Sequence, residues 1–207
     1  MQKKRVALLG CGSVGGFLAL ELIRTGLRDL TLVDHEILTL DNVYRHELGK
    51  DMVGTYKVLA LKQEIERKVP YTKITSIPEL AQTAIETGRL KSGRFDLIII
   101  AIGDETDCLH LNELIRSKRP YPPIIFSWLE PYGIGGHTLL TGNASARGCY
   151  ECLITPMTED EALYNRASFA APGQFFAKDI SGCGSLFTPY GSTDALQTAL
   201  LTSSFGG

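Results

Sequence analysis

The chain has 207 residues, 44% of them hydrophobic, and a formal net charge of -2 at pH 7. A chain of this size buries a substantial core as one domain, and its weak acidity argues against a nucleic-acid partner. No apolar run reaches the roughly 18 residues that span a bilayer, so we expect no membrane contact. Five cysteines, an odd number, predict reduced thiols in a cytoplasmic protein rather than a disulfide framework.

The chain opens with a strand, a glycine-rich turn and a helix. Apolar residues 6–9 predict the strand, and a helical pattern follows over 14–24. Between them, Gly10, Gly12 and Gly15 form a G-x-G-x-x-G pattern. The first glycine permits a tight turn, the second lets backbone approach a phosphate, and the third lets helix pack against strand. The helix N-terminus then faces the anion, so this segment predicts a phosphate-binding turn.

A second strand completes the nucleotide-binding pattern. Residues 30–33 predict this strand, and Asp34 follows it, where a ribose-binding carboxylate belongs in such a fold. Strand, glycines, helix, strand and acid in this order predict that the chain binds a nucleotide. Taken alone, they suit the NAD of a dehydrogenase as well as ATP. A Walker P-loop is excluded, because no G-x-x-x-x-G-K-[ST] occurs.

Strands and helices continue to alternate along the chain. We expect helices at 57–68, 78–90 and 107–117, and strands at 74–77, 95–102 and 123–128. The run at 95–102, FDLIIIAI, is typical of a central parallel strand that is covered on both faces. Later elements differ in character: an antiparallel strand at 135–140, a long irregular crossover loop at 148–188 and a helix at 192–201.

The predicted fold is therefore a single α/β domain over residues 1–207. Its nucleotide-binding core, residues 1–132, is a doubly wound, Rossmann-like, mostly parallel sheet. Residues 133–207 add the antiparallel extension, the crossover loop and the terminal helix.

Polar side chains that suit a nucleoside triphosphate follow the glycine turn. Asn42 and Arg45 stand three residues apart, and Lys57 begins a predicted helix. Asp104 follows the central strand, at the carboxyl end where α/β folds place ligands. An acid for the ribose, cations for the phosphates and a carboxylate for magnesium would serve ATP with Mg²⁺. Read singly, Arg45 and Lys57 are ordinary surface charges, and Asp104 is an ordinary helix cap.

In this order the motifs resemble the ThiF/MoeB/HesA family, the adenylating domains of ubiquitin-activating-type enzymes, over nearly the whole chain. The matching segments are GCGSVGG, LVDHEILTLDNVYRH, VGTYKVLAL, AIGDET and GCYECL. The resemblance implies that Asp34 binds the ribose, that Asn42, Arg45 and Lys57 bind the phosphates, and that Asp104 binds Mg²⁺. It also implies a homodimer.

Cys183, in the segment SGCGSLFTPYG, lies where the family often holds the cysteine that accepts an acyl group as a thioester. A thiolate suits this task because it is strongly nucleophilic near neutral pH, and the glycines around Cys183 favour an exposed site. The alternative is a small buried thiol. Cys11, inside the glycine turn, and Cys108, on a predicted helix, are expected to be structural.

Cys149 and Cys152 have the spacing of metal ligands and resemble half of the zinc site found in many family members. Zinc takes four ligands, and the chain has no second cysteine pair. Cys183, His137 or a partner subunit would have to complete the site.

The resemblance implies ATP-dependent adenylation of a protein's C-terminal carboxylate, with a Gly-type tail as substrate and a conjugating enzyme as further partner. The wording FTPYGS resembles bacterial antiviral defence members more than cofactor-biosynthesis members. Three alternatives stay open: a sulfur-carrier adenylyltransferase of thiamine or molybdopterin biosynthesis, an NAD-dependent oxidoreductase, and the inactive half of a heterodimeric activating enzyme. Intact Arg45, Lys57 and Asp104 count against the inactive half.

Overall fold

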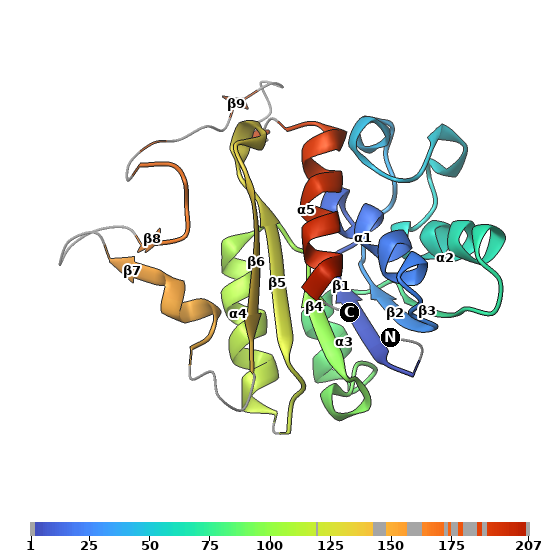
Figure 1. Cartoon of the computed structure of the whole chain (residues 1–207), viewed down its shortest axis with the longest axis horizontal. Coiled ribbons are helices and arrows are strands. Elements are labelled where there is room, and N and C mark those ends of the chain that lie inside the picture. The colour runs from blue at the N-terminus through green and yellow to red at the C-terminus, as the bar shows by residue number, and fades with distance from the viewer. Residues whose placement is uncertain are drawn as a thin grey trace.

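A six-stranded sheet with helices on both faces forms the centre of the protein (Figure 1). The computed structural model describes residues 3–118, 120–142, 148–156, 163–171, 174, 178–179, 186–187 and 190–205. The strands are β1 (Arg5–Leu9), β2 (Asp29–Val33), β3 (Lys73–Ile77), β4 (Leu97–Ile100), β5 (Ile124–Leu129) and β6 (Gly136–Thr141). Their order across the sheet is β3-β2-β1-β4-β5-β6. All neighbours run parallel except β5 and β6, which pair antiparallel.

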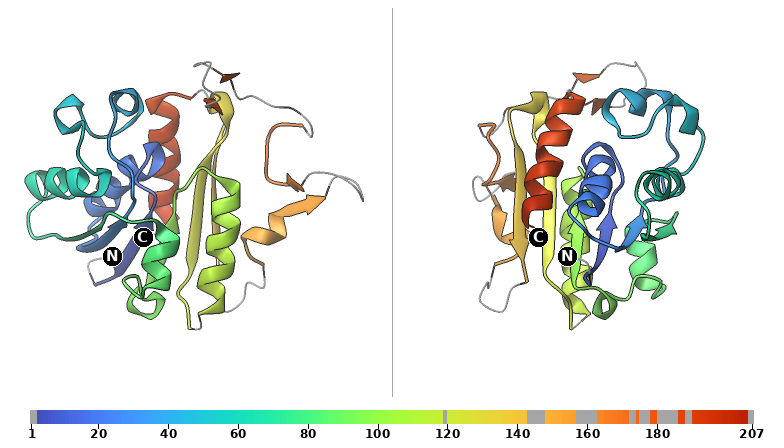
Figure 2. Two further views of the ribbon diagram at one scale, coloured as in Figure 1. Left: turned by 180° about the vertical axis from the view of Figure 1, so that it is seen from behind. Right: turned by 45° about the vertical axis from the view of Figure 1, so that its right-hand side comes forward.

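Two apolar layers bury the two faces of the sheet. The helices are α1 (Ser13–Arg24), α2 (Lys57–Lys68), α3 (Ala81–Glu86), α4 (Glu105–Ser117) and α5 (Ser192–Phe205). Helices α1, α2 and α5 cover one face, and α3 and α4 cover the other (Figure 2). Successive side chains of β1 alternate between the layers: Val6 and Leu8 join the first, whereas Ala7 and Leu9 join the second. None of the described helices is long and apolar enough to cross a bilayer.

The doubly wound, mostly parallel sheet with an antiparallel edge is confirmed, but three elements differ clearly in length from their predictions. The terminal helix, expected over 192–201, continues to Phe205. The helix expected over 78–90 is only Ala81–Glu86. Leu80 has extended backbone angles before it, and Gly88, with φ of +72°, turns the chain away after it. The strand expected over 95–102 is also shorter, at Leu97–Ile100.

Two short 3₁₀ helices, η1 (Leu40–Arg45) and η2 (Lys50–Met52), occupy a stretch where the sequence predicted no element. Three more 3₁₀ turns are η3 (Ser92–Arg94), η4 (Pro131–Gly133) and η5 (Tyr150–Leu153). The crossover region, expected to be irregular, contains two short antiparallel pairs among its described residues. These are β7 (Ile154–Pro156) with β8 (Leu163–Asn165), and β9 (Lys178–Asp179) with β10 (Leu186–Phe187).

The glycine turn joins β1 to α1 by close backbone contacts. Gly10 has φ of +89°, and a Cβ on it would lie 2.6 Å from the Ala101 carbonyl oxygen. A Cβ on Gly15 would lie only 2.0 Å from the carbonyl oxygen of Gly10. A Cβ on Gly12 would meet nothing within 4 Å. The first and third glycines are therefore required by packing, while the second leaves open space.

This difference predicts that alanine substitutions at the two positions lower the free energy of unfolding by different amounts. Gly15→Ala forces the helix off the turn, so we expect the free energy of unfolding to fall by about 1–3 kcal/mol. Gly12→Ala should cost less, about 1 kcal/mol at most, because the added methyl group has room and only the poorer N-cap preference of alanine opposes it. Denaturant unfolding of both variants measures this, and equal losses would contradict the packing argument.

Candidate nucleotide-binding site

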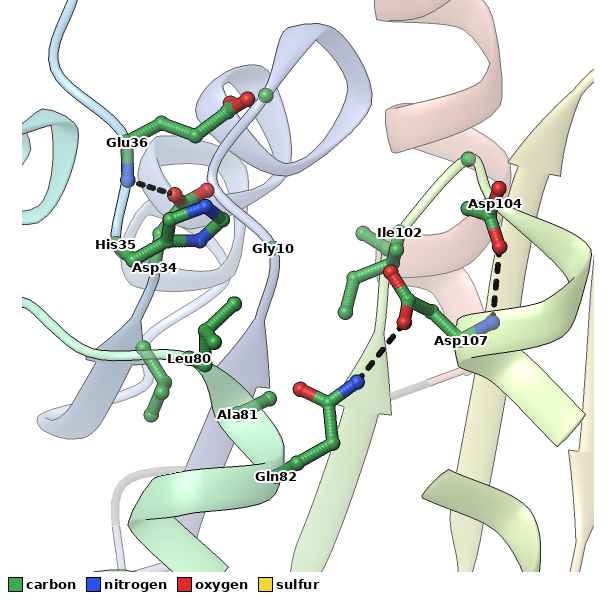
Figure 3. Close-up of a pocket in the computed structure, with 14 residues that line it drawn as sticks. Gly10, Asp34, His35, Glu36, Leu80, Ala81, Gln82, Ile102, Asp104 and Asp107 are labelled. Atoms are coloured by element: carbon green, nitrogen blue, oxygen red, sulfur yellow. Dashed lines mark hydrogen bonds between the residues drawn. The ribbon is translucent and has the colours of Figure 1, made fainter. Parts of the chain in front are cut away.

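A pocket of about 270 Å³ lies at the carboxyl ends of β1, β2 and β4 (Figure 3). The chain continues from β1 to β2 on one side, whereas β4 flanks β1 on the other, so the pocket lies at the point where the strand order reverses. Ligands of open α/β sheets bind at such points. Its lining includes Gly10, Gly12, Asp34, Glu36, Gln82, Asp104 and Asp107.

Asp34 forms one wall of this pocket and also holds the glycine turn. Its carboxylate is buried; one oxygen accepts from the Cys11 amide at 2.6 Å and the other from the Glu36 amide at 2.7 Å. Each carboxylate oxygen has a further lone pair, so ribose hydroxyls can donate to the same group. The predicted ribose ligand therefore lies in the pocket and has a structural role as well.

The N-terminus of α1 opens beside this wall. Gly12 is its N-cap, and no side chain in the described part of the chain caps it. The first amides of a helix have no partners within the helix and carry a partial positive charge. With the bare Gly12 backbone in the pocket lining, these amides offer a place for a phosphate.

Asp104 forms the opposite wall (Figure 3). Its exposed carboxylate is the N-cap of α4 and accepts from the Asp107 amide at 2.9 Å. The helix-cap interpretation is thus correct, and it is compatible with a second role because the carboxylate also lines the pocket. Asp107, which accepts from Gln82 at 2.9 Å, lies beside it.

The donor set at this wall fits Mg²⁺ that arrives with a triphosphate. No group of three or more metal-ligating side chains occurs among the described residues. Mg²⁺ in nucleotide sites is held by one or two carboxylates together with phosphates and waters, so a preformed cage is not required. Asp104 would hold the ion, which would neutralise charge on the phosphates.

The three residues expected to bind phosphates lie outside the pocket lining. Lys57 begins α2, and its ammonium group donates to the Glu36 carboxylate. The Lys57 side chain is 5% exposed and that of Glu36 is 54% exposed, so the lysine is the buried partner of this ion pair. Partial burial acts to raise the pKa of Glu36, but the hydrogen bond and charge of Lys57 prevail and lower it. Since Glu36 itself lines the pocket, Lys57 lies one side chain away from it.

Asn42 and Arg45 belong to η1. The side-chain oxygen of Asn42 accepts from the Thr39 amide at 3.3 Å and completes a capping box. The guanidinium carbon of Arg45 lies 5.0 Å from the ring centroid of Tyr190. Their phosphate-binding roles remain predictions.

His46 supports the glycine turn from outside the pocket lining, and it was not predicted from the sequence although it stands next to Arg45 in the motif. Its buried ring accepts from the Leu48 amide at Nδ1, 3.1 Å away, so Nε2 carries the proton and donates to the Cys11 carbonyl at 2.8 Å. A Cβ on Gly16 would lie 2.8 Å from this ring. Burial lowers the pKa of His46, and the charge of Lys57 lowers it further.

The cysteines fall into three groups. Cys11 and Cys108 are buried, in agreement with structural roles, and burial raises the pKa of both thiols, that of Cys108 to about 12. The sulfur atoms of Cys149 and Cys152 lie 3.8 Å apart. Two Zn–S bonds of about 2.3 Å at the tetrahedral angle span about this distance, so the pair has the geometry of half a zinc site. Cys183 lies outside the described residues.

His137 does not join the two cysteines within the described part of the chain. Its Nε2 lies 3.0 Å from a carboxylate oxygen of Glu130. Its ring stacks on Trp128 and on Phe169, with 4.6 Å between centroids in each pair. The expectation that His137 completes a metal site therefore gains no support, because its ring is already packed and hydrogen-bonded elsewhere.

This fold, with a pocket where the strand order reverses, is typical of the nucleotide-binding class of α/β proteins. The chain matches the ThiF family over residues 1–185 and belongs to that family.

Its relatives include the ATP-dependent ubiquitin transferase-like protein Cap2 of Pseudomonas aeruginosa, 29% identical over 203 residues. That match covers 96% of this chain and 34% of the relative; Cap2 of Escherichia coli, also 29% identical, gives 98% and 34%. A crystal structure of E. coli MccB with MccA-N7isoASN superposes with a TM-score of 0.70 at 15% identity, covering 98% of this chain and 55% of that chain. The chain thus spans about a third of the length of these curated relatives.

The depressed pKa of His46 predicts acid sensitivity. Below pH 6.5 the unfolded chain protonates this imidazole while the native state does not, so stability falls as the pH drops from about 7 to 5. We expect His46→Gln to be about 1–3 kcal/mol less stable at neutral pH and to lose less stability on acidification. Urea unfolding across this range measures both, with the exposed His110→Gln as control. An unchanged pH dependence in His46→Gln would contradict the assignment.

Proposed function

We propose that this chain catalyses ATP-dependent adenylation of the C-terminal carboxylate of a protein. The observation that carries the proposal is the pocket at the strand-order reversal of a ThiF-family chain, with Asp34 and Asp104 on facing walls. A ribose ligand on one wall and a magnesium ligand on the other suit a nucleoside triphosphate better than a dinucleotide redox cofactor. The family membership also favours ATP over NAD.

The reaction follows from the placement of these groups. Asp34 accepts hydrogen bonds from the ribose hydroxyls, and the amides at the start of α1 bind phosphate oxygens. Mg²⁺, when held by Asp104, supplies charge that stabilises the phosphates and the leaving pyrophosphate. An oxygen of the substrate carboxylate attacks the α-phosphorus, and the bond from that phosphorus to the bridging oxygen of the β-phosphate breaks. The products are an acyl-adenylate and pyrophosphate.

The names of similar proteins support a protein substrate and a nucleotide. The Cap2 relatives are described as ATP-dependent and ubiquitin transferase-like. The ubiquitin-like modifier-activating enzyme 5 of Drosophila simulans is 23% identical, covering 83% of this chain and 45% of that protein. By fold alone, MccB structures described with ATP and with MccA are neighbours, with TM-scores of 0.65 and 0.67.

In the second step that we propose, Cys183 takes over the acyl group. Its sulfur attacks the carbonyl carbon of the adenylate, AMP leaves, the thiol proton passes to solvent, and a thioester forms. The substrate would be a ubiquitin-like protein with a Gly-type tail, the acceptor a conjugating enzyme, and the setting bacterial antiviral conjugation. The active species would be a homodimer. A sulfur-carrier adenylyltransferase, which stops at the adenylate, is the second candidate.

The first step is tested by ATP–pyrophosphate exchange with peptides that end in glycine. Asp104→Ser keeps an N-cap for α4 but removes the charge, because serine caps helices about as well as aspartate. We expect at least about a 100-fold loss of exchange with an unchanged unfolding midpoint. Wild-type protein that binds NAD tightly in calorimetry, and does not bind ATP, would overturn the adenylation proposal.

The second step is tested separately by Cys183→Ala. This variant should retain pyrophosphate exchange, because exchange needs only the phosphate ligands, and should lose a thiol-cleavable adduct with the activated protein. Cys149→Ala serves as the matched control: we expect reduced stability or zinc content with exchange largely retained. An adduct that persists in Cys183→Ala, seen on non-reducing gels, would remove Cys183 from the reaction.

A further inference from the structure

Tyr190 connects two elements that the proposed function places at the phosphates. Its ring faces the guanidinium of Arg45, 5.0 Å from the ring centroid, and its hydroxyl donates to the Ser13 hydroxyl at 3.1 Å. Arg45 ends η1, and Ser13 is the first residue of α1, next to Gly12. One half-buried side chain therefore touches a predicted phosphate ligand and the start of the helix that faces the anion.

We propose that Tyr190 is a positioning residue for the phosphates of the nucleotide: it holds Arg45 beside the N-terminus of α1. This inference rests on the proposed function, because it presumes a nucleoside triphosphate in the pocket. Tyr190 itself does not line the pocket. It acts through Arg45, and its effect is therefore confined to ligands that carry phosphate.

The chemistry of the contact suits positioning. A cation–π contact attracts the charge of a guanidinium and does not require its N–H groups, which are the groups that bind phosphate oxygens. Arginine has a long side chain whose rotamer freedom is lost on binding a ligand. A partner that restricts the side chain in advance reduces this loss, so Arg45 held by Tyr190 binds phosphate more tightly than a mobile arginine.

The place of Tyr190 in the chain explains why it can hold both partners. It stands just before α5, where the Gly191 amide donates to the Asp194 carboxylate at 2.8 Å and starts the helix. Helix α5 lies along α1 on the same face of the sheet (Figures 1 and 2). The start of α5 is thereby fixed next to the start of α1, although 177 residues separate Tyr190 from Ser13.

Binding of Mg²⁺–ATP and of adenosine to three variants tests the inference. Tyr190→Leu should weaken ATP binding about threefold to tenfold and leave adenosine binding unchanged, because adenosine has no phosphate. Tyr190→Phe keeps the ring over Arg45 but loses the hydrogen bond to Ser13, so its ATP affinity should lie between those of wild type and Tyr190→Leu. In an Arg45→Ala background, Tyr190→Leu should have no additional effect, because the contact through which it acts is gone.

Each other outcome has a defined meaning. Equal weakening for ATP and adenosine, or an unchanged or tighter ATP affinity in Tyr190→Leu, overturns the positioning role. Unfolding midpoints are measured for every variant, and Tyr190→Gln replaces Tyr190→Leu with the same expectation if the latter does not fold. Wild-type protein that binds no ATP contradicts the proposed function together with this inference. If the wild-type protein binds ATP and Tyr190→Leu binds it with the same affinity, the result contradicts this inference and leaves the proposed function standing.

Discussion

The backbone of Cys11 is held at both of its polar groups by side chains that are distant in sequence. Its amide donates to Asp34 at 2.6 Å, and its carbonyl accepts from His46 at 2.8 Å. A buried backbone group without a partner costs about as much free energy as a lost hydrogen bond. Asp34 and His46 therefore stabilise the buried turn by pairing with both polar groups of Cys11. Because Leu9 pairs with Val33, β1 and β2 end at the same level, and Asp34 lies within hydrogen-bond distance of the turn. The shape of the phosphate-binding turn therefore depends on this double anchoring.

The polar side chains around the turn form a connected layer. Glu36 donates its amide to Asp34 and accepts from Lys57 with its carboxylate. Burial disfavours charge on His46, and the nearby ammonium group of Lys57 disfavours it further. The imidazole stays neutral, so it can accept at one nitrogen while donating at the other, as the contacts with Leu48 and Cys11 require. Burial, assisted by the charge of Lys57, thus lowers the pKa of His46 and favours the neutral imidazole on which the turn depends.

The sequence was sufficient to predict those features that local patterns encode. The glycines, the sheet class and the walls at Asp34 and Asp104 follow from residue spacing and strand ends. The structure adds the pairs that form across the chain: Glu36 binds Lys57 at a sequence separation of 21, and His46 binds the Cys11 carbonyl at a separation of 35. A single sequence carries no signal for such pairs. The helix expected at 78–90 ends early, at Glu86, because Gly88 turns the chain. The apolar spacing continues beyond Gly88, so the sequence pattern did not show this end.

The charge of the pocket lining explains why the proposed reaction needs cations that the lining itself does not provide. Four carboxylates line the pocket, those of Asp34, Glu36, Asp104 and Asp107, and none of the lining residues is a lysine or arginine. Such a lining repels a bare triphosphate, because like charges in a partly desolvated site interact strongly. Under the proposed function, binding of the triphosphate would require Mg²⁺ at the wall of Asp104 and compensation by Lys57 at the wall of Glu36. The half-exposed Glu36 carboxylate is a weaker partner for the buried ammonium group than a multiply charged phosphate, so in the proposed reaction the nucleotide would compete for Lys57 on favourable terms.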